Sequence, residues 1–174
     1  MKLYFVRHGQ TQFNKDGLIT GQIDEPLIEE GIQEAEATAE EMDTNYTEIY
    51  SSDLLRCRQT AEILNRKLNL EIKYDKRLRE RHFGSIAGKK FEDTDPTGEL
   101  RKRDLSCMYD YRQYGGESVE DVKNRIFSFI NEVKAKEGKI LIVTHGGVVR
   151  LLHNIVNNQK HDHIKNSSIH EFEF

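Results

Sequence analysis

The sequence predicts a three-layer α/β/α fold whose central sheet is mostly parallel. Short runs of β-branched, aromatic and other apolar residues recur along the chain, and such runs are typical of buried strands. They occupy residues 3–6, 48–53, 71–78 and 139–145. Helical patterns separate these runs, and strands that alternate with helices form βαβ units covered on both faces. No repeat, low-complexity tract or linker is present, so we expect residues 1–174 to form a single domain.

The helices are predicted from apolar residues that recur at helical spacing. The turn and short helix expected in residues 11–21 are followed by Pro26 and an apolar face that runs from Ile28 to Met42. A second apolar stripe runs from Leu54 to Leu68, with Ser52 or Asp53 as the expected N-cap.

The second half of the chain is patterned less evenly. Residues 91–117 are polar and weakly patterned, which favours an excursion over the surface. Ser118 and Asp121 form a capping box that opens a helix over residues 119–133. A further helix follows Gly146-Gly147, and SIHEFEF is expected to close the chain as an edge strand.

Composition limits the classes of function. A chain of 174 residues can bury about 70% of its unfolded surface. Its net charge of −4 gives little support for nucleic-acid binding. No apolar run reaches the length of a membrane span, and MKLYFVRHG lacks a signal-peptide pattern. Cys57 and Cys107 form neither a disulfide framework nor a metal motif. We therefore expect a cytoplasmic protein with no membrane or nucleic-acid partner.

Two apolar strands end in the same way, and both endings carry a histidine. FVRHG places Arg7 and His8, and IVTHGG places His145, at the carboxyl ends of strands, where open α/β sheets bind their ligands. A single histidine is more often structural than catalytic, but two in matching topological positions indicate a site. The glycines that follow let the backbone approach a ligand closely.

Two further junctions add charge. SSDLLRCRQTA places Arg56 and Arg58 in a first helical turn, where cations are unfavourable unless an anion binds there. RLRERHFG presents Glu80 among Arg77, Arg79 and Arg81. The alternatives are that the arginines of the helix are solvated and that those around Glu80 form a surface salt-bridge cluster worth little.

Together these groups suit phosphoryl transfer without a metal. Arginines bind phosphate oxygens bidentately and offset the developing charge. A histidine can attack phosphorus and form a covalent intermediate. A carboxyl group kept protonated by a neighbouring dianion can donate its proton to the leaving oxygen.

The blocks RHG with TQFN, SSDLLRCRQTA, LRERHFG and THGG resemble, in order, the histidine phosphatase superfamily, also called the phosphoglycerate mutase-like family. The resemblance covers essentially the whole chain and favours the phosphatase branch, in which a histidine acid-type phosphatase acts through phosphohistidine. It implies His8 as nucleophile and Glu80 as proton donor, and it places Arg7, Arg56 and His145 in the catalytic phosphate pocket. It also implies substrate contacts from Asn14, Thr20, Gly21 and Gly146.

The sequence departs from the family pattern in two places. Cys57 stands where alanine is usual, a small-for-small change from which we expect little consequence. Ala87 replaces the glutamate common in the FGxxEG stretch of the phosphatases.

His161-Asp162-His163 could face a metal from a strand, but no third ligand is evident nearby, and a solvated polar loop is the better interpretation. We expect no metal and no cofactor.

Three functions stay open within this resemblance. We expect a hydrolase of small phosphorylated metabolites, because the chain is short and its middle offers only Arg101-Lys102-Arg103 where mutases carry a paired-arginine lid. ERHFG also resembles the ERHYG of the cofactor-dependent phosphoglycerate mutases. A silent module that binds phospho-ligands is the third possibility. Residues 80–117 would recognise the leaving group, and Tyr109, Tyr111 and Tyr114 either line the entrance or pack on the body. Neither the substrate nor the oligomeric state can be predicted.

Overall fold

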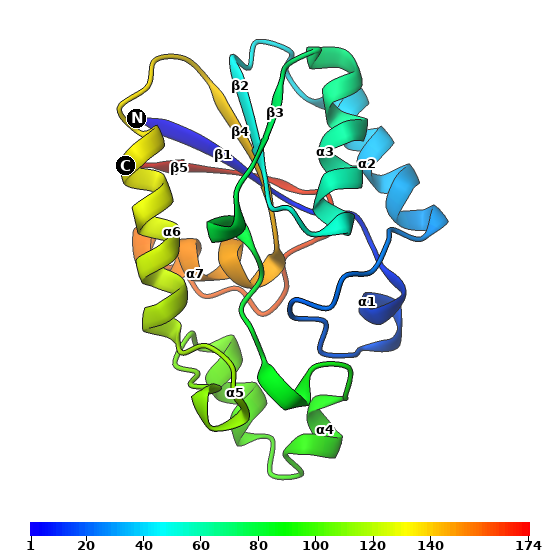
Figure 1. Ribbon diagram of the computed structural model, residues 1–174, viewed down its shortest axis with the longest axis vertical. Helices are drawn as coiled ribbons and strands as arrows, with labels where there is room; N and C mark the ends of the chain where they lie inside the picture. Colours follow the sequence, from blue (N-terminus) through cyan, green and yellow to red (C-terminus); the bar gives the residue numbers. More distant parts are fainter.

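A five-stranded sheet forms the centre of the protein, as the computed structural model of residues 1–174 shows (Figure 1). The strand order is β3-β2-β4-β1-β5, and β5 alone runs antiparallel to its neighbour. The strands are β1 (Lys2–Arg7), β2 (Glu48–Ser51), β3 (Ile72–Tyr74), β4 (Ile140–Thr144) and β5 (Ile169–Glu173). The predicted fold class is therefore confirmed, including the edge position of the last strand.

Helices cover both faces of this sheet (Figure 1). The α-helices are α1 (Gln12–Asp16), α2 (Glu29–Glu41), α3 (Leu55–Leu68), α4 (Phe91–Thr94), α5 (Glu99–Leu105), α6 (Val119–Val133) and α7 (Gly146–Val156). Short 3₁₀ helices are η1 (Lys76–Leu78), η2 (Gly84–Ile86) and η3 (Arg112–Tyr114).

Side-chain alternation in the central strands creates two hydrophobic cores. In β4, Ile140 and Ile142 pack toward α6 and α7, whereas Leu141 and Val143 pack toward α2 and α3. All four are fully buried. Burial of each such side chain contributes about 1.5–3 kcal/mol, so both helical layers are held to the same strand.

The start of α3 differs from the prediction. Leu54 is the N-cap and uses no side chain, and the first helical amide, that of Leu55, donates to Asp24 Oδ1 at 2.6 Å. The predicted cap, Ser52 or Asp53, is therefore wrong: a carboxylate from a distant loop takes this role. The Ser52 hydroxyl lies instead 2.9 Å from His145 Nε2. By contrast, the capping box of Ser118 and Asp121 is present at the start of α6.

The segment 91–117 is more ordered than its weak pattern predicts. It forms α4, α5 and η3 below the sheet in Figure 1. Phe91, Tyr109 and Tyr111 are buried in the core that lies against α6 and α7. Tyr109 and Tyr111 stack with ring centroids 5.4 Å apart, and Tyr114 packs against the same core. Of the two roles left open for these tyrosines, packing on the body is the correct one.

None of the helices is both long enough and apolar enough to cross a membrane.

Candidate active site

The two sequence-predicted histidines meet because their strands are neighbours. β1 pairs in parallel with β4, and Arg7 lies opposite Thr144 in the register. His8 and His145 therefore leave the same edge of the sheet, and their rings lie edge to face with centroids 5.2 Å apart. Gly9 lets the end of β1 pass close to α2, because a Cβ there would sit 2.3 Å from the Gly31 carbonyl oxygen. The convergence predicted from the two strand endings is confirmed.

His8 is held by hydrogen bonds on both ring nitrogens. Its Nδ1 lies 2.7 Å from the Gly9 carbonyl, which can only accept, so Nδ1 carries the proton. Its Nε2 is then unprotonated, and its lone pair accepts a hydrogen bond from Arg56 Nε at 3.2 Å. Burial, followed by the charges of Arg56 and Arg7, holds the pKa of His8 well below its usual range. The imidazole is therefore uncharged at neutral pH.

Arg56 is fixed by backbone carbonyls. The side chain is fully buried on α3, and it donates to Gly21 O at 2.6 Å and to Ile23 O at 2.8 Å. Arg58, two residues on, is exposed and lies over the Tyr74 ring at 5.2 Å. The first helical turn of α3 thus contributes one arginine to the site and one to the surface.

Arg7 and the start of α7 provide a place for an anion. Arg7 Nη1 donates to the Ile164 carbonyl, while Nε is buried without a partner. Burial lowers the pKa of Arg7 to about 10, although the negative charge of Glu80 opposes this shift. Gly146 is the first residue of α7, and its Cβ position lies 3.1 Å from Arg7 Nε. The helix has no side-chain cap, so its N-terminus adds positive potential.

Glu80 is held by two backbone amides. Gly147 N–H donates to Oε2 at 3.0 Å and Arg81 N–H donates to Oε1 at 2.9 Å, and the side chain is 14% exposed. Burial by itself would raise the pKa of Glu80. The Arg81 guanidinium and the two amides outweigh it, so the pKa lies below its usual value. Glu80 is ionised in the ligand-free protein, and a bound dianion would raise its pKa.

His145 lies behind His8 and does not line the cavity. It is fully buried, with Nε2 2.9 Å from Ser52 Oγ and 3.3 Å from Cys57 Sγ. Burial and the charge of Arg56 hold the pKa of His145 well below its usual range. Cys57, from which we expected little consequence, therefore forms part of the support of this histidine.

The cavity around these groups measures about 500 Å³ and is lined mainly by polar residues. Asn14 and Thr20 line it, and Asn14 Oδ1 accepts from Asn166 Nδ2 at 3.3 Å. Ala87 packs against the core and is not part of the lining. The predicted site residues at the cavity are Arg7, His8, Asn14, Thr20, Gly21, Arg56, Glu80 and Gly146.

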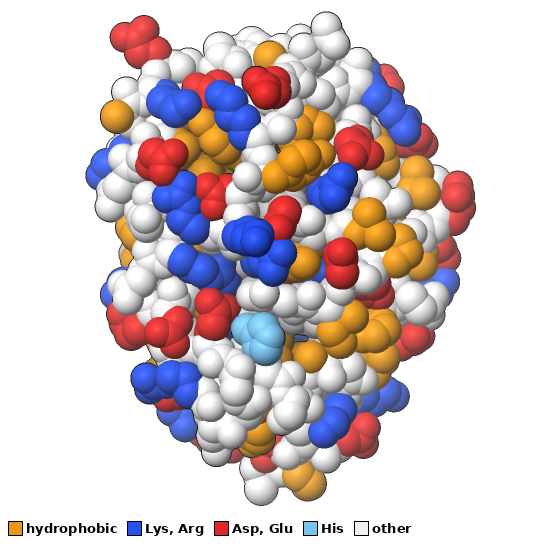
Figure 2. All heavy atoms as spheres, in the orientation of Figure 1, with side chains coloured by type: hydrophobic (Ala, Val, Ile, Leu, Met, Phe, Trp, Pro, Cys, Tyr) orange, Lys and Arg blue, Asp and Glu red, His pale blue; other side chains and the backbone are white.

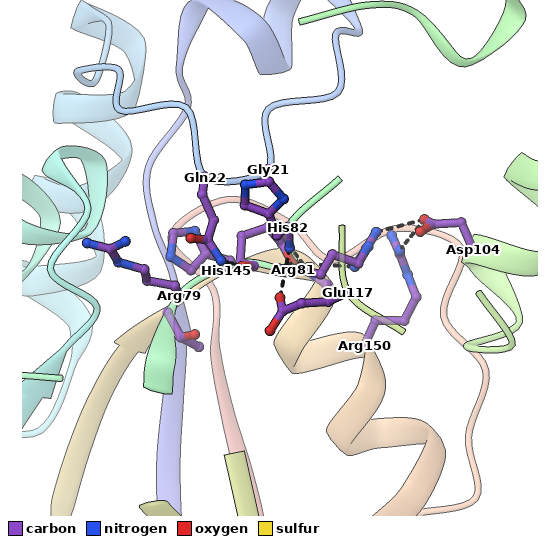
Figure 3. A network of polar contacts seen from close by, with 12 residues as sticks. Gly21, Gln22, Arg79, Arg81, His82, Asp104, Glu117, His145 and Arg150 are labelled. Atoms are coloured by element: carbon purple, nitrogen blue, oxygen red, sulfur yellow. Dashed lines mark hydrogen bonds and ion pairs between the residues drawn. The ribbon is translucent and has the colours of Figure 1, made fainter. Parts of the chain in front are cut away.

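Sequence reasoning missed a second group of residues at the cavity. Arg81 and Arg150 line it and both point toward Asp104 of α5 (Figure 3). Asn166 donates to the His8 carbonyl at 3.0 Å. Asp104 lies in the weakly patterned segment and Asn166 in a loop, so no spacing rule could have selected either.

The other arginines near Glu80 form surface ion pairs, as the alternative interpretation held. Arg77 pairs with Asp75 and Glu132, and Arg79 pairs with Asp53, all three pairs at 2.6–2.7 Å. Figure 2 shows the resulting mixture of positive and negative side chains along the centre of this face. Partly exposed pairs at the surface contribute little to stability.

No group of three or more histidine, cysteine, aspartate or glutamate side chains is arranged to hold a metal ion. His161 packs against His153, with ring centroids 4.2 Å apart.

The carboxyl edge of the sheet thus gathers two buried histidines, two arginines and a carboxylate around one polar cavity. The profile of the histidine phosphatase superfamily (branch 1) matches residues 3–174. The chain belongs to this superfamily and is an enzyme of the histidine phosphatase type.

Relatives within the superfamily carry both mutase and phosphatase names. Phosphoglycerate mutase-like protein 4 of Arabidopsis thaliana is 32% identical, with 98% of this chain and 78% of that protein covered. The fructose-2,6-bisphosphatase TIGAR of Xenopus tropicalis is 40% identical over 73% of this chain, which corresponds to 47% of that protein. The probable phosphoglycerate mutase GpmB of Salmonella paratyphi A is 33% identical, with 84% of this chain and 70% of that protein covered.

Solved structures agree with this assignment. The mycobacterial glucosyl-3-phosphoglycerate phosphatase, solved in complex with VO3, superimposes with a TM-score of 0.86 at 29% identity. The match covers 98% of this chain and 90% of that one. A protein of Thermus thermophilus gives a TM-score of 0.82 at 30% identity, with 98% of this chain and 92% of that chain covered.

Proposed function

We propose that this protein hydrolyses phosphomonoesters of small metabolites through a covalent phosphohistidine on His8. The observation that carries the proposal is the unprotonated Nε2 of His8, which lies 3.2 Å from Arg56 Nε in a polar cavity with Glu80 on its wall. A neutral imidazole fixed beside a guanidinium is arranged to attack a bound phosphate.

In the first step, His8 Nε2 forms a bond to phosphorus while the bond from phosphorus to the ester oxygen breaks. The charges of Arg7 and Arg56 offset the negative charge on the phosphoryl oxygens. Glu80, protonated in the complex with the dianionic substrate, donates its proton to the leaving oxygen. The alcohol then leaves, and the phosphate remains on His8.

In the second step, Glu80 is a carboxylate and can accept a proton from water. The water oxygen bonds to phosphorus, the N–P bond breaks, and inorganic phosphate leaves. His8 returns to its neutral state with Nδ1 still donating to Gly9. The cycle balances with the residues of the cavity alone, and we propose that it needs no metal.

The cavity supports a small, polar leaving group. Only 5 of its 25 lining residues are hydrophobic, so the alcohol portion of the substrate should carry hydrogen-bonding groups. The relatives that are named for fructose-2,6-bisphosphate and glucosyl-3-phosphoglycerate support a phosphorylated sugar or sugar acid as the substrate class.

Phosphoglycerate mutase activity is the second candidate, because the GpmB relative is named as a probable mutase. In this chain Arg101 lines the cavity, whereas Lys102 and Arg103 are exposed and do not. The middle segment therefore offers one arginine to the cavity where a mutase would carry a paired-arginine lid, and this favours hydrolysis.

One assay separates the candidates. The protein should release inorganic phosphate from at least one member of a panel of sugar and sugar-acid phosphates. A parallel incubation with 3-phosphoglycerate and bisphosphoglycerate should give no fast conversion to 2-phosphoglycerate. Efficient conversion would establish the mutase, and binding of phosphate esters without turnover of any of them would establish a silent binding module.

A further inference from the structure

Arg81 lies between two carboxylates and is closer to the one that takes no part in the proposed chemistry. Its Nη2 is 2.7 Å from Asp104 Oδ2, whereas its Nη1 is 3.4 Å from Glu80 Oε1. The Asp104 side chain is completely buried, and that of Arg81 is 7% exposed. Figure 3 shows Arg81 directed toward Asp104.

Asp104 is held in place from two other sides. The Tyr111 hydroxyl donates to Oδ1 at 2.7 Å, and Arg150 Nη1 lies 3.5 Å from Oδ2. Arg150 is itself anchored, because its Nε donates to His161 O at 3.0 Å. A carboxylate from α5 is therefore fixed beside the site.

The charges show what Asp104 does there. Two guanidiniums, that of the buried Arg81 and that of the partly buried Arg150, share this one carboxylate. If Asp104 were neutral, Glu80 would be the remaining carboxylate in contact with Arg81. A guanidinium within about 4–6 Å stabilises the ionised form of a carboxyl group by about 1–3 pKa units. A general acid needs the opposite effect, because it has to carry a proton when the substrate is bound.

We propose that Asp104 is a positioning residue that draws the Arg81 guanidinium away from Glu80 and so keeps Glu80 able to act as the proton donor. The proposal rests on the function proposed above, and it assigns a role to α5. Asp104 does not touch the substrate; it acts on the reaction through Arg81.

Other charged and polar groups also face Glu80, and they are common to every variant considered below. Gly147 N–H and Arg150 face it from α7, Arg7 from β1, and Tyr109 from the segment between α5 and α6. Arg56 and Cys57 face it from α3. Of these groups only Arg150 also contacts Asp104, and it makes no ion pair with Glu80. Arg81 is thus the one direct link between the two carboxylates.

The experiment is an NMR titration of the Glu80 carboxyl carbon, with and without inorganic phosphate, in the wild-type protein and in Asp104→Asn. Loss of the Asp104 charge should lower the Glu80 pKa by about one unit or more in both states. With an alkyl phosphate as substrate, the basic limb of the pH profile of kcat should move to lower pH. The sign follows because activity is lost when the acid deprotonates, and a lower pKa brings that loss to a lower pH.

Two further variants keep the proposal falsifiable if Asp104→Asn does not fold. Arg81→Gln removes the guanidinium itself and should raise the Glu80 pKa. In that background, adding Asp104→Asn should have much less than its single effect, because the link is gone. Tyr111→Phe leaves the charge of Asp104 intact and should leave the Glu80 titration where it is.

The outcomes separate this inference from the proposed function. A Glu80 titration that is unmoved in Arg81→Gln or in Asp104→Asn overturns the role of Asp104, whatever the catalytic activity. Titration shifts as predicted with an unchanged pH profile for kcat would show that Asp104 controls Glu80 and that Glu80 is not the acid. The second result rejects the proposed mechanism and leaves the link from Asp104 to Glu80 intact.

Discussion

Two regions of the cavity differ in what fixes their chemistry. We call Arg7, His8 and Arg56 the floor, and Glu80 with Arg81 the wall. On the floor, His8, Arg7 and Arg56 each bond to a backbone carbonyl, those of Gly9, Ile164 and Gly21. On the wall, backbone amides also hold Glu80, but its carboxylate lies beside the Arg81 guanidinium, and Arg81 in turn pairs with Asp104 from a distant segment. The groups proposed to bind the phosphate are therefore set by main-chain geometry, whereas the proton affinity of the proposed proton donor is set by a chain of side-chain charges.

Because of this difference, variants of the floor and variants of the wall should affect different substrates. A change on the floor should slow the reaction of every phosphate ester to a similar degree, because all share the phosphoryl group. A change on the wall should discriminate between leaving groups, because only a poor leaving group needs the proton.

The largest effect is expected on the wall. Glu80→Gln should lower the rate for an alkyl phosphate by about 10²–10⁴-fold, because an alkoxide cannot leave without a proton. With nitrophenyl phosphate the first step should suffer much less, since nitrophenolate leaves unaided. Burst kinetics would separate this step from the later activation of water.

A second glutamate of the same cavity provides a matched control variant. Glu92 of α4 is exposed and lines the cavity, and Glu92→Gln should leave both rates near those of the wild type. If Glu80→Gln slows both substrates equally and slightly, Glu80 is a structural residue and the acid lies elsewhere.

On the floor, Arg56 and Arg58 form a natural pair for comparison. Arg56→Met should reduce kcat/KM about 10²–10³-fold for alkyl and nitrophenyl phosphates alike, because one buried donor to the transition-state charge is lost. Arg58→Met should change kcat/KM little, since Arg58 is exposed over Tyr74. A leaving-group preference in Arg56→Met would contradict the division between floor and wall.

The buried histidines of the floor should also make stability depend on pH. His8 and His145 have pKa values well below the value of about 6.5 expected in the unfolded chain. Below pH 6.5 the unfolded state binds more protons, so the free energy of unfolding should fall as the pH is lowered toward 5. The slope approaches about 1.4 kcal/mol per pH unit for each histidine.

Urea unfolding at a series of pH values measures this dependence. His8→Asn should give a shallower slope than the wild type, because one buried titrating group is removed. Equal slopes for the two proteins would mean that His8 is already protonated in the folded state, which a nucleophile does not allow.

The smallest expected effect is that of metal removal. Arg7 and Arg56 provide the positive charge that Mg²⁺ supplies in many phosphoryl-transfer sites. Exhaustive chelation should leave phosphate release essentially unchanged. Loss of activity that one divalent ion restores would contradict the proposal that the two arginines supply the positive charge at the phosphate.

The floor could be predicted from the sequence and most of the wall could not, for physical reasons. A buried strand that ends in Arg7-His8-Gly9 places its side chains by main-chain topology, and that topology can be predicted from apolar periodicity. Ser52 shows where local rules fail: a preferred cap residue binds His145 instead, because Asp24 binds the first amide of α3. The position of Asp104 depends on how residues 91–117 fold back against the cavity, and no local sequence pattern predicts that tertiary contact.

The most direct test of the account is to find the phosphate on His8. Wild-type protein quenched during turnover of a ³²P-labelled phosphomonoester should retain label that is stable in base and released in acid, as expected for a phosphoramidate. Peptide mapping should place the label on the peptide that contains His8, and His8→Ala should retain none. Label retained by His8→Ala, or label that is stable in acid, would contradict the account.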